Sequence, residues 1–256
     1  MGRTVITIFS CFALASSAAA QTPGATVLER SSVPDEAYQQ AVVKGPDSDS
    51  PAWLIRTWAP VGERDAESAP IRAVVVIDGQ ADVGAAAAMA RQVEAVAADE
   101  ALLVITIAPA DEAVAQTFRR RGWTETERAA LADYLRRTLA PELRGRSDVA
   151  TLRLIGIGRG ADVALAVFGQ DPAAFDSVYA KDHGLTGEAL SAIAAALPAG
   201  KADLRLKLDL GWSQASDAPN SATLVFLEKV RARGHAVGWK INEGDEQFLR
   251  RSLFAP

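Results

Sequence analysis

Short, uniformly apolar runs alternate with longer mixed segments along most of this chain. Val74–Ile77 and Leu102–Ile105 are apolar at every position, a pattern typical of strands that are buried on both faces. Longer segments between such runs, for example residues 159–169, are predicted to be helices. Regular alternation of strands and helices favours a mostly parallel sheet with helices on both faces. The hydrophobic pattern therefore predicts a protein of the α/β class.

The predicted strands begin with an antiparallel hairpin, because the first two are separated by the turn-rich segment Gly45–Pro51. Eight strands are predicted, at residues 37–44, 53–58, 72–77, 102–107, 151–155, 177–180, 204–210 and 235–241. Helices are predicted at residues 85–97, 125–139, 159–169, 187–196, 221–233 and 245–253. With a hydrophobic content of 49%, a chain of this length can bury one large core. We predict a single domain at residues 36–256, preceded by a flexible segment at residues 21–35.

The first twenty residues have the composition of a secretory signal peptide. Arg3 is followed by the apolar stretch Val5–Leu14, and Ala18–Ala20 provides a small-residue cleavage site before Gln21. We therefore expect residues 1–20 to be removed and the protein to be periplasmic or secreted. The single cysteine, Cys11, lies inside this leader, so the exported chain would form no disulfide. No later segment reaches the roughly 20 apolar residues of a membrane span.

The net charge of the chain disfavours some classes of binding partner. The formal net charge is -5, which gives no support to binding of nucleic acid or anionic membranes. The basic cluster Arg119–Arg121 is isolated and is interpreted as a solvated helix face. No metal site and no cofactor are predicted, and a small-molecule ligand is the expected partner.

The sequence Gly156-Ile157-Gly158-Arg159-Gly160 has the frame of a nucleophile elbow. In the G-x-S-x-G elbow a strand turns sharply into a helix, and the central serine presents its hydroxyl as the nucleophile. A predicted strand precedes this motif and a predicted helix follows it, so its expected context is present. Gly158, however, occupies the position of the serine and has no hydroxyl.

Several further motifs occur in an order and spacing that resemble one known family. The chain resembles the esterase branch of the α/β-hydrolase fold, which includes siderophore trilactone (enterochelin-type) esterases and esterase D-like enzymes. The resemblance covers residues 36–256 and implies an eight-stranded, mostly parallel sheet with an N-terminal antiparallel hairpin. Its motifs are Trp58-Ala59-Pro60, Ile77-Asp78-Gly79-Gln80, Leu139-Ala140-Pro141, the elbow frame and Pro172-Ala173-Ala174-Phe175.

The same resemblance implies a catalytic triad that this chain has lost. The family order is nucleophile, acid and base, which places the nucleophile at Gly158 and the acid within residues 211–217, where Asp217 is the best carboxylate. The base falls on Gln247 in Gly244-Asp245-Glu246-Gln247. An amide does not titrate in a useful range, whereas an imidazole does. We therefore predict a pseudoenzyme of the ester-hydrolase class that binds a ligand or a partner.

The two histidines of the chain do not fall at the position of the family's base. His183 follows the sixth predicted strand, where it either lines the pocket or has a structural role in its loop. His235 begins the eighth predicted strand and is interpreted as a solvated or capped histidine. Asp245 and Glu246 are interpreted as stabilising a helix N-terminus. The candidate ligand-binding residues are Gly79, Gln80, Arg159, His183 and Trp212.

Two other functions fit parts of the sequence. An active hydrolase with rearranged residues would use Ser213 or Ser216, although neither has a histidine partner in the expected order. Residues 156–161 also satisfy the dinucleotide fingerprint G-x-G-x-x-A, with Asp182 after the next strand as a ribose-binding carboxylate. Loss of a serine from an elbow creates this match by itself, and four predicted strands precede it.

Overall fold

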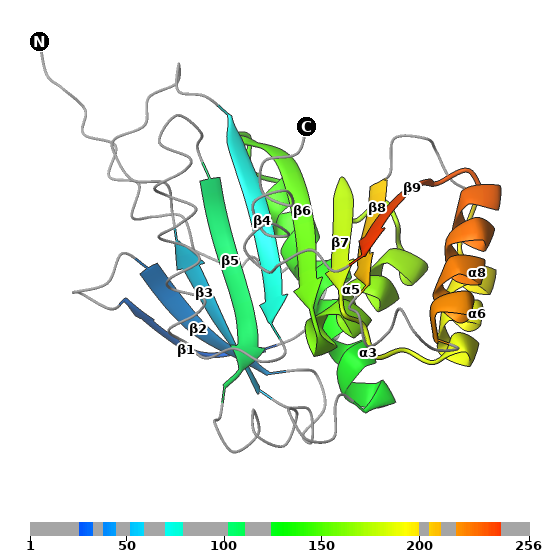
Figure 1. Cartoon of the computed structure of the whole chain (residues 1–256). Coiled ribbons are helices and arrows are strands. Elements are labelled where there is room, and N and C mark those ends of the chain that lie inside the picture. The colour runs from blue at the N-terminus through cyan, green and yellow to red at the C-terminus, as the bar shows by residue number, and fades with distance from the viewer. Residues whose placement is uncertain are drawn as a thin grey trace, which may run out of the picture.

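The fold is built on one large twisted sheet (Figure 1). The computed structural model describes residues 26–32, 38–44, 52–58, 70–78, 102–110, 124–199, 205–210 and 219–241. The strands are β1 Thr26–Ser32, β2 Tyr38–Lys44, β3 Ala52–Trp58, β4 Ile71–Asp78, β5 Leu102–Pro109, β6 Val149–Ile157, β7 Ser177–Lys181, β8 Arg205–Leu210 and β9 Ala236–Ile241. The helices are α3 Glu125–Tyr134, η2 Leu135–Leu139, α4 Ala140–Arg144, α5 Arg159–Gln170, α6 Gly187–Ala196 and α8 Pro219–Ala232.

The order of the strands confirms the fold class expected from the sequence. The sheet runs β1-β2-β3-β5-β4-β6-β7-β8-β9. Strands β1, β2, β3 and β5 pair antiparallel, and β5, β4, β6, β7, β8 and β9 pair parallel. Strands β2–β9 are the eight predicted strands, and β2 and β3 form the predicted hairpin. The predicted helices at residues 85–97 and 245–253 lie outside the described residues.

Strand β1 is an addition that the sequence did not reveal. It falls in the segment 21–35, which we expected to be flexible. Strand β1 pairs antiparallel with β2, and the register shifts between Val27 and Glu29. Pairing satisfies backbone hydrogen-bonding groups at the free edge of β2. The segment has no alternation of apolar and polar residues, so its sequence pattern gives no strand signal.

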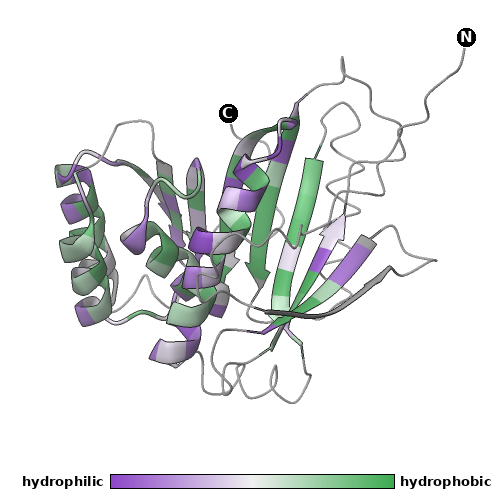
Figure 2. Cartoon of the chain, turned by 180° about the vertical axis from the view of Figure 1, so that it is seen from behind, coloured by the Kyte–Doolittle hydropathy of each residue, from purple (hydrophilic) through white to green (hydrophobic). Residues whose placement is uncertain are grey.

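The hydrophobic core lies between the sheet and the described helices. Val75 of β4 and Leu154 of β6 are fully buried in one cluster with Leu131 of α3 and Val163 of α5. Figure 2 shows strands β4 and β5 coloured mainly as hydrophobic. Residues 160–169 of α5 are all buried, which is expected for a helix that is apolar on nearly every side. None of the described helices has the length and hydrophobicity that a membrane span requires.

The predicted helix at residues 125–139 is a composite in the structure. It begins at Thr124, which forms a capping box with Glu127, and α3 then widens into the π-helix η2 before α4. In η2 the Ala140 N–H donates to the Leu135 carbonyl, one residue further back than in an α-helix. Pro141 follows at once, and a proline has no N–H to donate and crowds the preceding turn. The wider turn accommodates this proline.

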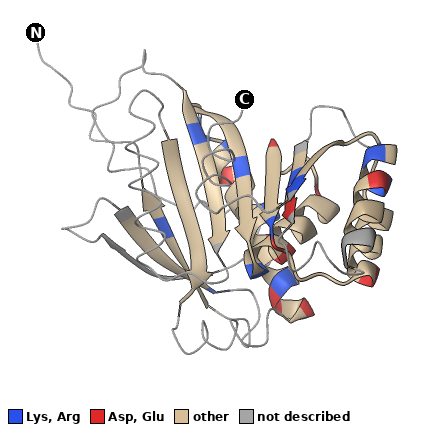
Figure 3. Ribbon diagram, viewed as in Figure 1, with Lys and Arg blue, Asp and Glu red and all other residues tan. Residues whose placement is uncertain are grey.

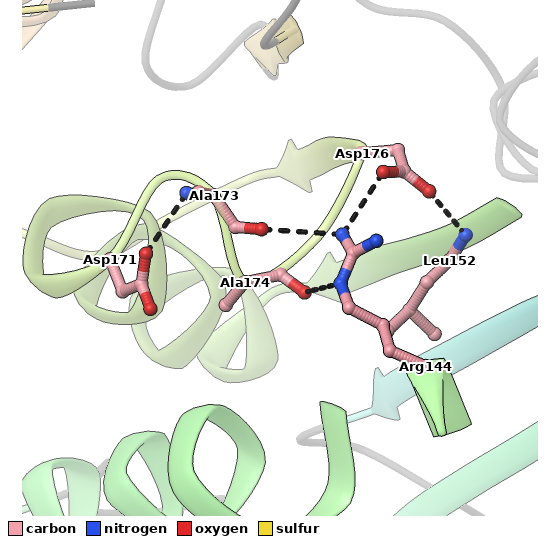
Figure 4. A network of polar contacts seen from close by, with 6 residues as sticks. All are labelled: Arg144, Leu152, Asp171, Ala173, Ala174 and Asp176. Atoms are coloured by element: carbon pink, nitrogen blue, oxygen red, sulfur yellow. Dashed lines mark hydrogen bonds and ion pairs between the residues drawn. The ribbon is translucent and has the colours of Figure 1, made fainter. Parts of the chain in front are cut away.

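A polar network joins the end of α4 to the loop before β7 (Figure 4). The Arg144 guanidinium donates to the carbonyls of Ala173 (3.2 Å) and Ala174 (3.3 Å) and to Asp176 Oδ1 (3.0 Å). The other oxygen of Asp176 accepts the Leu152 backbone N–H at 2.7 Å. Asp176 therefore connects the loop to β6 at the amino ends of the parallel strands, away from the elbow at their carboxyl ends.

Candidate functional site

The candidate site lies at the carboxyl ends of β4 and β6, where the chain reverses its order in the sheet. From β4 the chain continues to β5 on one side, whereas β6 lies on the other side of β4. Ligands of open α/β sheets bind outside the strand ends at such a switch point. Gly158 is located there, between β6 and α5.

The backbone at Gly158 has the strained conformation of an elbow. Its φ is 56° and its ψ is -120°, a combination that glycine adopts far more readily than other residues. Its N–H donates to the Lys181 carbonyl of β7 at 2.8 Å, and its own carbonyl accepts the Ala161 N–H at 3.1 Å. The strand–turn–helix context predicted for this motif is therefore confirmed.

The two flanking glycines allow α5 to begin in contact with β4 and β6. A Cβ at Gly160 would lie 2.0 Å from the Ile77 carbonyl oxygen of β4, and one at Gly156 would lie 2.4 Å from the Gly160 carbonyl oxygen. No side chain fits at either distance. The glycines of the frame are thus required by close backbone packing, independently of any chemistry at Gly158.

Arg159, the residue after Gly158, presents a partly exposed guanidinium at this edge. Its side chain is 40% exposed, and its Nη1 lies 3.8 Å from Asp162 Oδ2. A Cβ at Gly184 would lie 2.5 Å from the same Nη1, so the guanidinium lies against the backbone of that residue. Asp162 is the one carboxylate within ion-pair distance of Arg159 among the described residues.

Asp162 is the buried ion-pair partner of Arg159. Its side chain is only 6% exposed, and its Oδ1 accepts the Gly184 N–H at 2.7 Å. Burial raises the pKa of this carboxyl, while the Gly184 hydrogen bond and the charges of Arg159 and Arg128 oppose the rise. The sequence analysis did not single out Asp162. The available signal was a carboxylate inside the otherwise apolar segment 161–168.

His183 is buried rather than open to a ligand. It lies in the loop between β7 and α6 with 3% of its surface exposed, and its Nε2 is 3.2 Å from the Thr223 hydroxyl of α8. Burial lowers the pKa of His183 to about 4. The ring is therefore neutral at pH 7 and links this loop to α8. Of the two roles considered for His183, the structure favours the structural one.

His235 is buried as well, at 2% exposure, which corrects the expectation of a solvated ring. Its Nε2 lies 3.1 Å from the Pro198 carbonyl, so the expected polar capping is present. The ring packs edge-on against Phe168 of α5 with 5.4 Å between centroids. His235 immediately precedes β9 and lies between α5 and the segment that follows α6.

Three charged side chains, two of them buried, lie in a row at the carboxyl ends of β7, β8 and β9. Lys181 of β7, Asp209 of β8 and Lys240 of β9 occupy adjacent register positions, so they share one face. Asp209 is fully buried and Lys181 is 5% exposed. Figure 3 shows further basic residues along β3, β4 and β6. Asp209 precedes the loop in which the acid was expected, and the sequence analysis did not identify it.

The other predicted site residues lie outside the described part of the chain. They are Gly79, Gln80, Trp212, Asp217 and Gln247, together with Ser213 and Ser216. Of the predicted site residues, Gly158 and Arg159 lie together at the elbow, and His183 lies in the loop after β7 against α8. No group of three or more metal-ligating side chains occurs within the described part of the chain.

Comparison with known proteins gives structural matches only. No protein-family model matches the sequence, and no curated protein matches it significantly. The siderophore hydrolase EstB from Aspergillus nidulans matches with a TM-score of 0.63 at 20% identity, over 87% of this chain and 93% of that one. An IroE-like serine hydrolase from Shewanella oneidensis gives 0.60 at 15% identity, over 85% and 78%. The enterobactin and salmochelin hydrolase IroE gives 0.55 at 15% identity, over 87% and 96%.

These matches extend over 85–87% of this chain. At such identities they establish the architecture, while the chemistry has to be argued from the site. The protein has an α/β-hydrolase fold, with Gly158 at the centre of its strand–turn–helix elbow.

Proposed function

We propose that this protein is an exported, non-hydrolytic member of the esterase-like α/β-hydrolases that binds a small anionic ligand at its former active site. The observation that carries the proposal is Gly158, a residue without a side chain in the elbow conformation of a nucleophile. Serine hydrolysis begins with attack by the elbow hydroxyl. An elbow without that hydroxyl forms no acyl-enzyme.

The described histidines do not supply a replacement base. His183 is neutral and buried, and it contacts Thr223 on α8. His235 is buried at the amino end of β9, whereas the elbow lies at the carboxyl ends of the strands. A general base must reach the proton that it removes. Gln247, which the family resemblance places at the base position, is an amide. The proposal therefore treats both the nucleophile and the base as lost.

Arg159 supports an anionic ligand. Its guanidinium is directed by Asp162 and by the backbone of Gly184, yet 40% of the side chain stays exposed. A cation that is held in place beside the elbow loses little entropy when it binds an anion, and a guanidinium can bind a carboxylate or phosphate with two parallel hydrogen bonds. In the proposal, Gly79, Gln80 and Trp212 line the remainder of the site.

The names of the structural neighbours indicate the first ligands to test. Several are hydrolases of siderophores, and one is named for enterobactin and salmochelin. A protein that keeps the scaffold without the nucleophile would bind such a siderophore and leave it intact. Export through the leader at residues 1–20 would place it in the periplasm or outside the cell, where it would meet such molecules.

The loss of hydrolysis is tested with an activity probe. The purified mature protein is incubated with a fluorophosphonate and, separately, with short acyl esters, beside an active serine esterase and a heat-denatured sample. We expect no labelling, and ester hydrolysis at the rate of the denatured sample. Stoichiometric labelling of any serine would refute the proposal, and labelling at Ser213 or Ser216 would establish the rearranged hydrolase instead.

Ligand binding is tested by titrating iron-loaded and iron-free enterobactin while tryptophan fluorescence is followed. Arg159→Ala is compared with Arg137→Ala, an arginine on η2 with a 57% exposed side chain. We expect saturable binding that Arg159→Ala weakens at least tenfold and Arg137→Ala leaves unchanged. Equal affinity in both variants would contradict the role of Arg159. Intact enterobactin after incubation, checked by mass spectrometry, distinguishes binding from turnover.

A further inference from the structure

The large hydrophobic side chains that remain exposed are concentrated at one end of the sheet. Within the described residues they are Leu224 (39% exposed), Val225 (46%) and Trp239 (45%). Leu224 and Val225 belong to α8 and Trp239 to β9, and Figure 1 shows both elements at the end of the sheet opposite β1. An exposed tryptophan beside exposed aliphatic residues is typical of an interaction site.

The same end carries the last strand of the sheet. Among the described strands, β9 pairs with β8 alone. An edge strand presents a row of unpaired backbone N–H and C=O groups, and proteins usually protect such edges with bulges or prolines. Residues 236–241 contain no proline, and their register with β8 runs without a shift. Lys240 is the single charged residue of the strand.

Trp239 and α8 lie on the same side of this edge. Val237 packs against the core to which Phe226 and Leu227 of α8 also belong. Trp239 is two residues further along β9 and therefore projects from the same face as Val237. The edge of β9, Trp239 and the exposed Leu224 and Val225 of α8 thus lie at the same end of the sheet, which we call its apolar border.

We propose that this border is a dimer interface at which β9 pairs antiparallel with β9 of a second copy. A twofold axis through Gly238 would place Val237 opposite Trp239 of the partner and Ala236 opposite Lys240 of the partner. By symmetry, each of these pairs would occur two times in the dimer. Each Trp–Val pair is an aromatic and β-branched cross-strand pair, which stabilises antiparallel strands. The two sheets would then form one continuous sheet, and Leu224 and Val225 of each copy would lie beside the paired β9 strands.

A second copy fits this edge better than an unrelated strand because the edge is complementary to itself. Pairing about Gly238 keeps side chains on their own faces and brings apolar residues together. It also separates the two Lys240 residues by about four strand positions, or roughly 13 Å, whereas pairing about Trp239 would bring them closer. Gly238 leaves room at the axis, since within the described part of the chain a Cβ there would contact Lys207 Cγ alone, at 3.8 Å.

The oligomeric state tests this interface without reference to any ligand. The mature protein is examined by light scattering and sedimentation velocity over a range of concentrations, with Trp239→Lys, Val225→Lys and Gln170→Lys. Gln170 is an exposed residue at the far end of α5 and serves as the matched control. We expect twice the monomer mass for the wild type and for Gln170→Lys, and a dissociation constant raised at least about 30-fold by Trp239→Lys.

Cross-linking tests the register. V237C protein is mixed with W239C protein and oxidised, and Q170C serves as the control for random collisions. We expect a disulfide-linked heterodimer in the mixture at a rate well above that of either variant alone or of Q170C. A monomeric wild type at high concentration, or a dimer that Trp239→Lys leaves unchanged, would overturn the interface. Preferential cross-linking of W239C to itself would overturn the pairing about Gly238.

Discussion

Gly160 provides the sharpest test of the elbow, because the structure gives the space available to a side chain there. In Gly160→Ala the new Cβ would lie 2.0 Å from the Ile77 carbonyl oxygen. A carbon and a carbonyl oxygen approach no closer than about 3.3 Å. The start of α5 and the end of β4 would therefore have to separate by more than about 1 Å, in a region where both are fully packed.

Both atoms in this contact belong to rigid backbone or to a Cβ, so no rotamer change relieves it. Overpacking of a core costs typically about 1–3 kcal/mol, and a backbone clash of this depth belongs at or above the upper end. We expect Gly160→Ala to lower the free energy of unfolding by at least about 3 kcal/mol. With a urea m-value of about 2 kcal/mol/M, the unfolding midpoint falls by more than about 1 M.

Gly145→Ala is the matched control for this prediction. Gly145 has a φ of -69°, and a Cβ there would lie 3.3 Å from the Pro141 carbonyl oxygen. Alanine adopts this conformation readily, so the midpoint should change by no more than the equivalent of about 1 kcal/mol in either direction. Urea unfolding is followed by circular dichroism for both variants. Equal midpoints would show that α5 does not begin against β4 and would refute the elbow geometry.

Three further predictions concern pH, the loop before β7 and the lost triad. Because the pKa of His183 is about 4 in the folded protein and 6.5 otherwise, the unfolded chain binds the extra proton between these values. Stability should therefore fall as the pH drops from about 6.5 towards 4, by up to about 3 kcal/mol, and His183→Gln should reduce this loss in urea titrations. Asp176→Ala should cost about 1–3 kcal/mol in the same assay, because the part-buried Leu152 N–H loses its acceptor. Gly158→Ser with Gln247→His should hydrolyse a short acyl ester faster than either single variant, since a nucleophile and its base act as a unit.

Each of these predictions has a control and a contradicting result. Asp162, whose carboxyl pKa is raised by burial, changes stability in the opposite direction on acidification, so the His183→Gln comparison is made at matched pH values. Identical pH slopes would contradict the role of His183. Arg146→Ala removes the ion pair with Asp148 and leaves no backbone N–H without its side-chain acceptor, so it should cost at most about 1 kcal/mol. A loss equal to that of Asp176→Ala would contradict the Leu152 argument. Equal activity in Gly158→Ser alone would show that Gln247 is not at the base position.

The sequence predicted the elements whose signal is local. Buried parallel strands are apolar at consecutive positions, so β4 and β5 were located within one or two residues at each end. The elbow was also visible, because its glycines serve a turn between a strand and a helix that lie next to each other in the chain. Helix α6 was placed with its bounds correct, since Thr186 caps its start and Pro198 follows its end.

The tertiary structure decided the features that depend on partners distant in sequence. Strand β1 has no strand pattern of its own and exists because β2 offers an unpaired edge. The burial of His183 depends on α8, and its partner Thr223 is forty residues away. The same holds for Asp162, whose role depends on Gly184. Hydrophobic periodicity records which residues are apolar, whereas the environment of a polar side chain is set by whichever elements the fold brings beside it.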